Sequence, residues 1–133
     1  MGKRRILYLD DEAACLRLFV GMLGESYEVR TAQTLAQARA MLAERPAEIV
    51  ISDQLMPEME GTDFLREVAE KYPASCRVLL TGTVTLGHVI LKVGSGLIQF
   101  FLTKPWTEQE MRGLLERAGA YLDSPERKKT ALP

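Results

Sequence analysis

Three aspartates, one threonine and one lysine stand in this sequence at places where apolar runs end. Asp10 and Asp11 follow "ILYL", Asp53 follows "EIVIS", Thr81 follows "RVLL", and Lys104 follows "IQFFLT". Three carboxylates beside one ammonium group would leave a small pocket with a net negative charge, which calls for a divalent cation. Carboxylate oxygens of this number suit Mg²⁺, which binds through one or two carboxylates and keeps several waters.

With such a cation bound, a carboxylate of the cluster could attack a phosphoryl group. The cation removes most of the repulsion, so Asp53 or Asp10 could approach phosphorus and form an aspartyl-phosphate. Such a transfer depends mainly on positioning and on charge neutralisation. The cation, the Lys104 ammonium group and the Thr81 hydroxyl could each hold one phosphoryl oxygen. These residue types therefore predict phosphoryl transfer onto an aspartate.

The pattern of apolar residues predicts the elements that position these side chains. Five β-rich runs, "ILYLD", "YEVRT", "EIVISD", "RVLLTG" and "IQFFLTK", alternate with helical patterns. Pairs with a capping signature, Thr34 with Gln37 and Thr107 with Glu110, precede two of the helices. The inward faces of the five predicted helices are Leu16, Phe19, Val20 and Leu23; Leu35, Ala38, Met41 and Leu42; Phe64, Leu65, Val68, Ala69 and Tyr72; Leu86, Val89, Ile90 and Val93; Met111, Leu114, Leu115, Ala118 and Leu122.

This alternation predicts an α/β fold of the (βα)₅ kind, a doubly wound five-stranded parallel sheet with helices on both faces. Such a fold is a flavodoxin-like three-layer sandwich. We expect residues 1–123 to form one domain, and 124–133, "SPERKKTALP", to be a tail or the start of a linker. In such sheets ligands bind outside the carboxyl ends of the strands. The five polar residues are expected at that edge.

Composition narrows the classes of function. The 133 residues are 47% hydrophobic and 26% charged, with a formal net charge of −1. We therefore expect no membrane attachment and no direct nucleic-acid binding by this domain. No apolar run is long enough to span a bilayer. Cys15 and Cys76 lack the spacing of metal ligands and are interpreted as reduced thiols of a cytoplasmic protein.

Four motifs give the sequence a family resemblance. "LDDE" follows the first strand, "SDQLMPEMEG" surrounds Asp53, "LLTG" ends the fourth strand, and "FLTKPW" follows the fifth. With these motifs, spread over residues 5–122, the chain resembles a response-regulator receiver domain of the CheY-like kind. "LLTG" with "FLTKPW" is similar to the subset found ahead of HD-GYP phosphodiesterase modules or transcriptional outputs. The resemblance implies the strand order 2-1-3-4-5 for the sheet.

The resemblance also implies roles around a bound Mg²⁺. Asp53 would be the phospho-acceptor, and the donor a sensor histidine kinase or a phosphotransfer protein. Asp11 would bind Mg²⁺ directly, Asp10 largely through water, and the Leu55 backbone carbonyl would complete the metal shell. Leu55 offers no group that could orient a water molecule for attack. We therefore expect slow self-dephosphorylation, in a regulatory phospho-acceptor that is not an enzyme in the ordinary sense.

The same resemblance implies a switch and an output surface. Thr81 and Lys104 would contact the phosphoryl group, and the aromatic residue Phe101 would move inward when Thr81 is drawn to it. The readout would be the surface of the fourth helix, fifth strand and fifth helix, around residues 84–122. An effector domain or a homodimer partner would dock there.

Three other functions share parts of this pattern. A flavodoxin-like cofactor binder should carry Gly, Ser and Thr after the first strand, whereas "DDEA" would repel a flavin phosphate. A phosphohydrolase with an aspartyl-phosphate needs a second carboxylate two residues after Asp53, where this chain has Leu55. A receiver that acts by protein interaction, without phosphorylation, would not require the complete set of Asp11, Asp53, Thr81 and Lys104.

Overall fold

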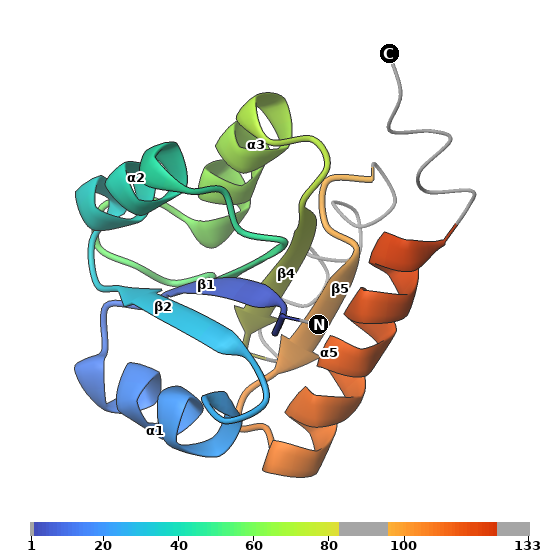
Figure 1. The fold of residues 1–133 in the computed structure, drawn as a ribbon. Helices are drawn as coiled ribbons and strands as arrows, with labels where there is room; N and C mark the ends of the chain where they lie inside the picture. The colour runs from blue at the N-terminus through green and yellow to red at the C-terminus, as the bar shows by residue number, and fades with distance from the viewer. Residues whose placement is uncertain (1, 83–95, 125–133) are drawn as a thin grey trace.

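Five parallel strands form one sheet in the order β2-β1-β3-β4-β5 (Figure 1). The structure is a computed structural model and describes residues 2–82 and 96–124. The α/β fold and the strand order 2-1-3-4-5 that the sequence predicts are confirmed. The strands are β1 (Arg5–Leu9), β2 (Glu28–Ala32), β3 (Ile49–Asp53), β4 (Cys76–Thr81) and β5 (Phe100–Thr103).

Helices cover both faces of the sheet, as doubly wound folds require. Figure 1 shows α2 and α3 on one side and α1 and α5 on the other. Their bounds are α1 (Ala13–Leu23), α2 (Leu35–Glu44), α3 (Gly61–Lys71) and α5 (Glu108–Asp123). The helix predicted around Leu86 to Val93 lies outside the described residues, and so does the predicted tail from 125 onward. Among the described residues, no helix combines the length and the hydropathy that a membrane span requires.

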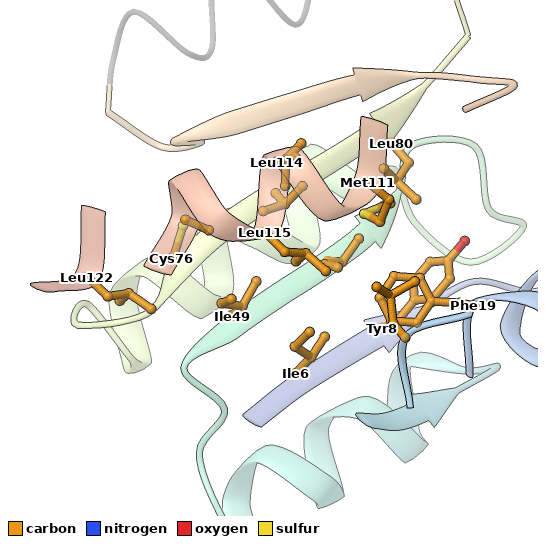
Figure 2. Close-up of a cluster of buried hydrophobic side chains, with 14 of the residues drawn as sticks. Ile6, Tyr8, Phe19, Ile49, Cys76, Leu80, Met111, Leu114, Leu115 and Leu122 are labelled. Atoms are coloured by element: carbon orange, nitrogen blue, oxygen red, sulfur yellow. The ribbon is translucent and has the colours of Figure 1, made fainter. Parts of the chain in front are cut away.

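Alternate residues of the strands enter two separate cores because successive side chains point to opposite faces. The first core lies between the sheet and helices α1 and α5, and Figure 2 shows part of it, with Ile6, Tyr8 and Ile49 facing the α5 leucines. The second core holds Leu7, Val50 and other strand residues against α2 and α3. β3 is buried along its whole length, as expected for a central parallel strand.

The strand register brings the ends of the strands level with one another. Leu9 pairs with Ser52, Asp53 with Leu80, and Thr81 with Thr103. The residues that follow these pairs therefore emerge at one edge of the sheet. This is the edge at which the sequence predicts the polar cluster.

The two predicted helix caps are present, whereas the predicted inward face of α1 needs one correction. Thr107 and Glu110 form a complete capping box at the start of α5. The Thr34 hydroxyl accepts from the Gln37 N–H at the start of α2. The prediction that Val20 faces inward from α1 was wrong, because its side chain is 42% exposed while Leu16, Phe19 and Leu23 are buried. Val20 follows Phe19 by one position, about 100° around the helix, which turns it to the solvent side.

Candidate functional site

Three carboxylates meet at the carboxyl edge of the sheet. Oxygens of Asp10, Asp11 and Asp53 all lie within 4.8 Å of one another. Asp10 is fully buried and Asp53 is 6% exposed, whereas Asp11 lies on the surface. The three side chains come from the ends of two adjacent strands, β1 and β3, which the register holds side by side. The donors are oxygens only, so their chemistry fits a hard divalent cation such as Mg²⁺.

The buried carboxylate of Asp10 is fixed by hydrogen bonds to both of its oxygens. The Tyr8 hydroxyl donates to Oδ2 at 2.7 Å, and the Glu12 backbone N–H donates to Oδ1 at 3.0 Å. Tyr8 precedes Asp10 by two positions on the same face of the strand, and both side chains are buried. This arrangement holds Asp10 in one orientation at the floor of the site.

Lys104 joins the acids from the position directly after β5. Its ammonium group lies 2.7 Å from Asp53 Oδ1 and 3.4 Å from Asp10 Oδ2. Its backbone N–H donates to the Thr81 carbonyl at 2.9 Å, which extends the β4–β5 pairing by one residue. The peptide bond from Lys104 to Pro105 is cis. Backbone and side chain together place the only cation that the described residues bring to these acids.

The pKa values of Asp53 and Lys104 are both raised, but for different reasons. Burial raises the pKa of the Asp53 carboxyl, and the charges of Asp10 and Asp11 raise it further, although the hydrogen bond from Lys104 opposes this shift. Burial alone would lower the pKa of Lys104, but the hydrogen bond to Asp53 and the charges of Asp53 and Asp10 raise it above its ordinary value. Lys104 therefore stays charged, while the ionised form of Asp53 still lacks full compensation. A bound cation would supply the missing positive charge.

The predicted switch residues, Thr81 and Phe101, lie on β4 and β5. Thr81 is 1% exposed, and its hydroxyl donates to the Gly82 carbonyl at 3.2 Å. Phe101 pairs with Leu79 across β4 and β5, and its half-buried ring packs against the second core. Phe100 packs instead against the first core, where it meets Tyr121 edge-on. The two phenylalanines therefore occupy opposite faces of the sheet, as the alternation of a strand predicts.

Gln54, whose role the sequence interpretation missed, holds the segment after Asp53 by hydrogen bonds. The Gln54 backbone N–H donates to the Leu80 carbonyl at 2.9 Å. The Gln54 carbonyl and side-chain Oε1 accept from the N–H groups of Gly61 and Thr62, each at 2.9 Å. These bonds close the loop between β3 and α3 and leave the Leu55 side chain 64% exposed at its surface. A glutamine directly after the strand end carries no pattern that would have identified this role.

Tyr8 was also missed as a site residue. The sequence interpretation placed it in the buried strand "ILYL" and assigned it only to packing. Its spacing of two from Asp10 was the available signal, because residues i and i+2 of a strand point to the same face. Every site residue predicted with a side-chain role, apart from Thr81 and Phe101, lies within the acid cluster or contacts it.

An apolar pocket of about 380 Å³ opens beside the acids. Its walls come from β1, from α1 with the residue before it, and from the segment that follows β5, and they include Tyr8, Leu18, Lys104 and Trp106. Leu18 is 64% exposed, so the pocket is accessible from solvent. Lys104 belongs to both the pocket and the acid cluster, which places an apolar surface directly next to the charged site.

Comparison with known proteins relates the chain to one family. The family model described as "Response regulator receiver domain" matches residues 6–116. The hydrogenase transcriptional regulatory protein HoxA of Cupriavidus necator is 29% identical over 113 residues, which cover 85% of this chain and 23% of HoxA. The chain spans about a quarter of the length of the first curated regulators that it matches.

Two solved receiver domains match this chain over nearly their whole length. The signal receiver domain of an HD domain-containing protein from Pseudomonas fluorescens Pf-5 is 31% identical, with a TM-score of 0.85. That match covers 96% of this chain and 94% of the other. A CheY-like response regulator receiver domain protein from Methanospirillum hungatei JF-1 is 28% identical, with a TM-score of 0.79 and coverage of 97% and 99%.

Proposed function

Because this chain belongs to the response regulator receiver domain family, we propose that it is a phosphorylation-controlled switch. It would take a phosphoryl group from a sensor histidine kinase or a phosphotransfer protein onto Asp53, with Mg²⁺ bound. The family consists of regulators rather than ordinary enzymes. The observation that carries the proposal is the meeting of Asp10, Asp11, Asp53 and Lys104 at one edge of the sheet.

The hydrogen bonds of Asp10 and the exposure of Asp11 support different roles for these two residues at the metal. Both oxygens of Asp10 already accept hydrogen bonds, which favours a contact to the ion through water. Asp11 is exposed and is therefore free to turn a carboxylate oxygen toward the ion. Asp11, Asp53 and the Leu55 backbone carbonyl would hold Mg²⁺ directly. The bound ion neutralises charge on the carboxylates and on the transferred phosphoryl oxygens.

The proposed transfer makes and breaks one bond to phosphorus. A carboxylate oxygen of Asp53 attacks the phosphorus of a phosphohistidine, so a P–O bond forms as the P–N bond breaks. The leaving imidazole nitrogen keeps the electron pair of the broken P–N bond and takes a proton from solvent. Lys104, now 2.7 Å from Asp53 Oδ1, would follow the new negative charge onto a phosphoryl oxygen, and the Thr81 hydroxyl would turn from the Gly82 carbonyl to another.

The output step uses the two switch residues. A Thr81 hydroxyl drawn to the phosphoryl group leaves space at the end of β4, and the half-buried Phe101 ring on β5 would move inward to fill it. The readout surface would include β5 and α5; its predicted part on the fourth helix lies outside the described residues. An effector domain, as in the transcriptional regulators that the chain resembles, or a second copy of the chain would bind there. The cytoplasm is the proposed location.

Phosphorylation by a small donor tests the proposal without the unknown kinase. We expect the protein to gain the mass of one phosphoryl group when incubated with phosphoramidate and Mg²⁺, and to lose it in alkaline hydroxylamine. Asp53→Asn should gain nothing, and EDTA should prevent the gain in wild type. Beryllofluoride with Mg²⁺, a mimic of the acyl phosphate, should shift NMR signals of Thr81 and Phe101. A wild-type protein that stays unmodified and unshifted would support a module that acts by binding alone.

A further inference from the structure

We propose that Tyr8 is a positioning residue of the metal site, whose hydroxyl sets the orientation of Asp10 and thereby the affinity for Mg²⁺. This inference rests on the proposed function, because it concerns the ion that the acids would hold. Tyr8 touches neither the ion nor the phosphoryl group in this proposal. It acts through Asp10, to which it donates a hydrogen bond of 2.7 Å.

Packing against a neighbouring aromatic ring restricts the movement of the Tyr8 side chain. Tyr8 is fully buried, and its ring lies 4.9 Å from that of Phe19 at an interplanar angle of 58°. Phe19 in turn meets Trp106 edge-on, with ring centroids 6.2 Å apart. Figure 2 shows the Tyr8 and Phe19 rings packed together at one end of the first core. A ring fixed in this way places its hydroxyl at one point, so the oxygen that it binds is fixed as well.

Asp10 and Asp53 compete for a single ammonium group, and the Tyr8 hydroxyl affects that competition. Lys104 lies 2.7 Å from Asp53 but 3.4 Å from Asp10 Oδ2, the oxygen that Tyr8 holds at 2.7 Å. Asp10 therefore takes the neutral donor at short range, and Asp53 takes the cation. Without the hydroxyl, Lys104 is the closest remaining side-chain donor that the structure describes for Oδ2. Asp10 would then turn toward Lys104, away from the position in which it serves a metal.

Tyr8→Phe tests this inference because it removes one oxygen and keeps the ring. Loss of a hydrogen-bond partner of a direct metal ligand typically weakens metal affinity about 10–100-fold, and Tyr8 lies one step further from the ion because Asp10 contacts it through water. We therefore expect the dissociation constant for Mg²⁺ alone, measured by calorimetric titration, to rise by about three- to tenfold. Tyr27→Phe is the matched control, since Tyr27 packs against the same core but makes no contact with the acids in the described structure. It should leave the constant unchanged.

A double-mutant cycle separates positioning from general loosening of the core. If Tyr8 acts through Asp10, adding Tyr8→Phe to Asp10→Asn should weaken Mg²⁺ binding no further. Additive losses would instead mean that the substitution loosens the site as a whole, and would overturn the inference. Unchanged or tighter binding by Tyr8→Phe would overturn it too and leave the proposed function standing. A wild-type protein that binds no Mg²⁺ would remove both.

A measurement on the wild-type chain keeps the inference testable if the variant does not fold. A buried hydroxyl in a short hydrogen bond exchanges slowly with water, so its proton should give an NMR signal. We expect the Tyr8 hydroxyl signal to shift when Mg²⁺ is added, because the acceptor carboxylate changes its charge environment. The backbone amide signal of Tyr27, which does not contact the acids in the described structure, should not move. A Tyr8 signal that ignores Mg²⁺ would refute the role.

Discussion

Gly61→Ala should destabilise the protein and loosen the loop that carries the acceptor aspartate. Gly61 is the first residue of α3, where the helix passes directly beside the end of β3. A Cβ built on it would lie 2.3 Å from the Asp53 carbonyl oxygen and 2.9 Å from the Leu79 Cδ1. Backbone on one side and a buried side chain on the other leave no flexible neighbour to move away. The helix start must therefore shift away from Asp53.

The size of the effect follows from overpacking. An extra methyl group in a tightly packed place costs about 1–3 kcal/mol of unfolding free energy. The usual gain from replacing glycine by alanine is small here, because the first helical position has few intrahelical bonds to stabilise. For a chain of 133 residues, this cost corresponds to a fall in Tm of roughly 4–11 °C. The shift would also strain the hydrogen bond from the Gly61 N–H to the Gln54 carbonyl, now 2.9 Å.

Urea denaturation and Mg²⁺ titration of the variant measure the two consequences. Gly21→Ala is the control, because a Cβ on this exposed residue of α1 meets nothing within 4 Å. It should be neutral or stabilising by up to about 1 kcal/mol. Gly61→Ala should also bind Mg²⁺ more weakly, since the backbone of Asp53 moves. Wild-type stability and metal affinity in Gly61→Ala would refute the reasoning that the close approach at this glycine positions the site.

Three further changes test other parts of the structure. Leu55→Asn should speed the loss of the phosphoryl group about fivefold, because one amide that orients the attacking water contributes about 1 kcal/mol; an unchanged decay rate would contradict this. Arg77→Met should cost about 2–4 kcal/mol in urea unfolding, because the 6%-exposed guanidinium donates to three backbone carbonyls, of Ser75, Gly96 and Leu97. Glu67→Gln should remove a small stabilisation that depends on pH. The hydrogen bond from Arg39 holds the pKa of Glu67 below its ordinary 4.5, so the advantage of wild type should be full above that pH and vanish as the pH falls through the lowered pKa; an advantage that persists in acid would speak against it.

The sequence predicted the placement of the acids because strand periodicity and parallel topology are sufficient for it. Each apolar run ends in a polar residue, and parallel strands end at a common edge. The observed register agrees with this expectation, because Asp53 lies opposite Leu80 and Thr81 opposite Thr103, so adjacent strands end level with one another. No knowledge of loops was needed. The sequence therefore predicts that Asp10, Asp11 and Asp53 form one cluster.

Contacts that depend on loop conformation could not be predicted in the same way. Gln54 clamps the loop after β3 with both backbone and side chain, but nothing in "SDQLMP" distinguishes it from a solvated turn residue. The prediction that Val20 faces the core was wrong for a related reason. An apolar residue next to the buried face of a helix can lie on either side of the edge of that face. Periodicity defines the direction of a side chain only to within about one position. Tertiary packing decides the rest.

Tyr8 shows how one residue can serve both the core and the site. Its ring lies in the first core with Phe19, whereas its hydroxyl reaches the buried carboxylate of Asp10. A buried carboxylate without donors would be costly, so the strand that delivers Asp10 also delivers a donor two positions earlier, on the same face. Asp11, one position later, turns to solvent and keeps its charge available. The alternation of a single strand thus divides two adjacent acids into one that is fixed and one that is free to bind an ion.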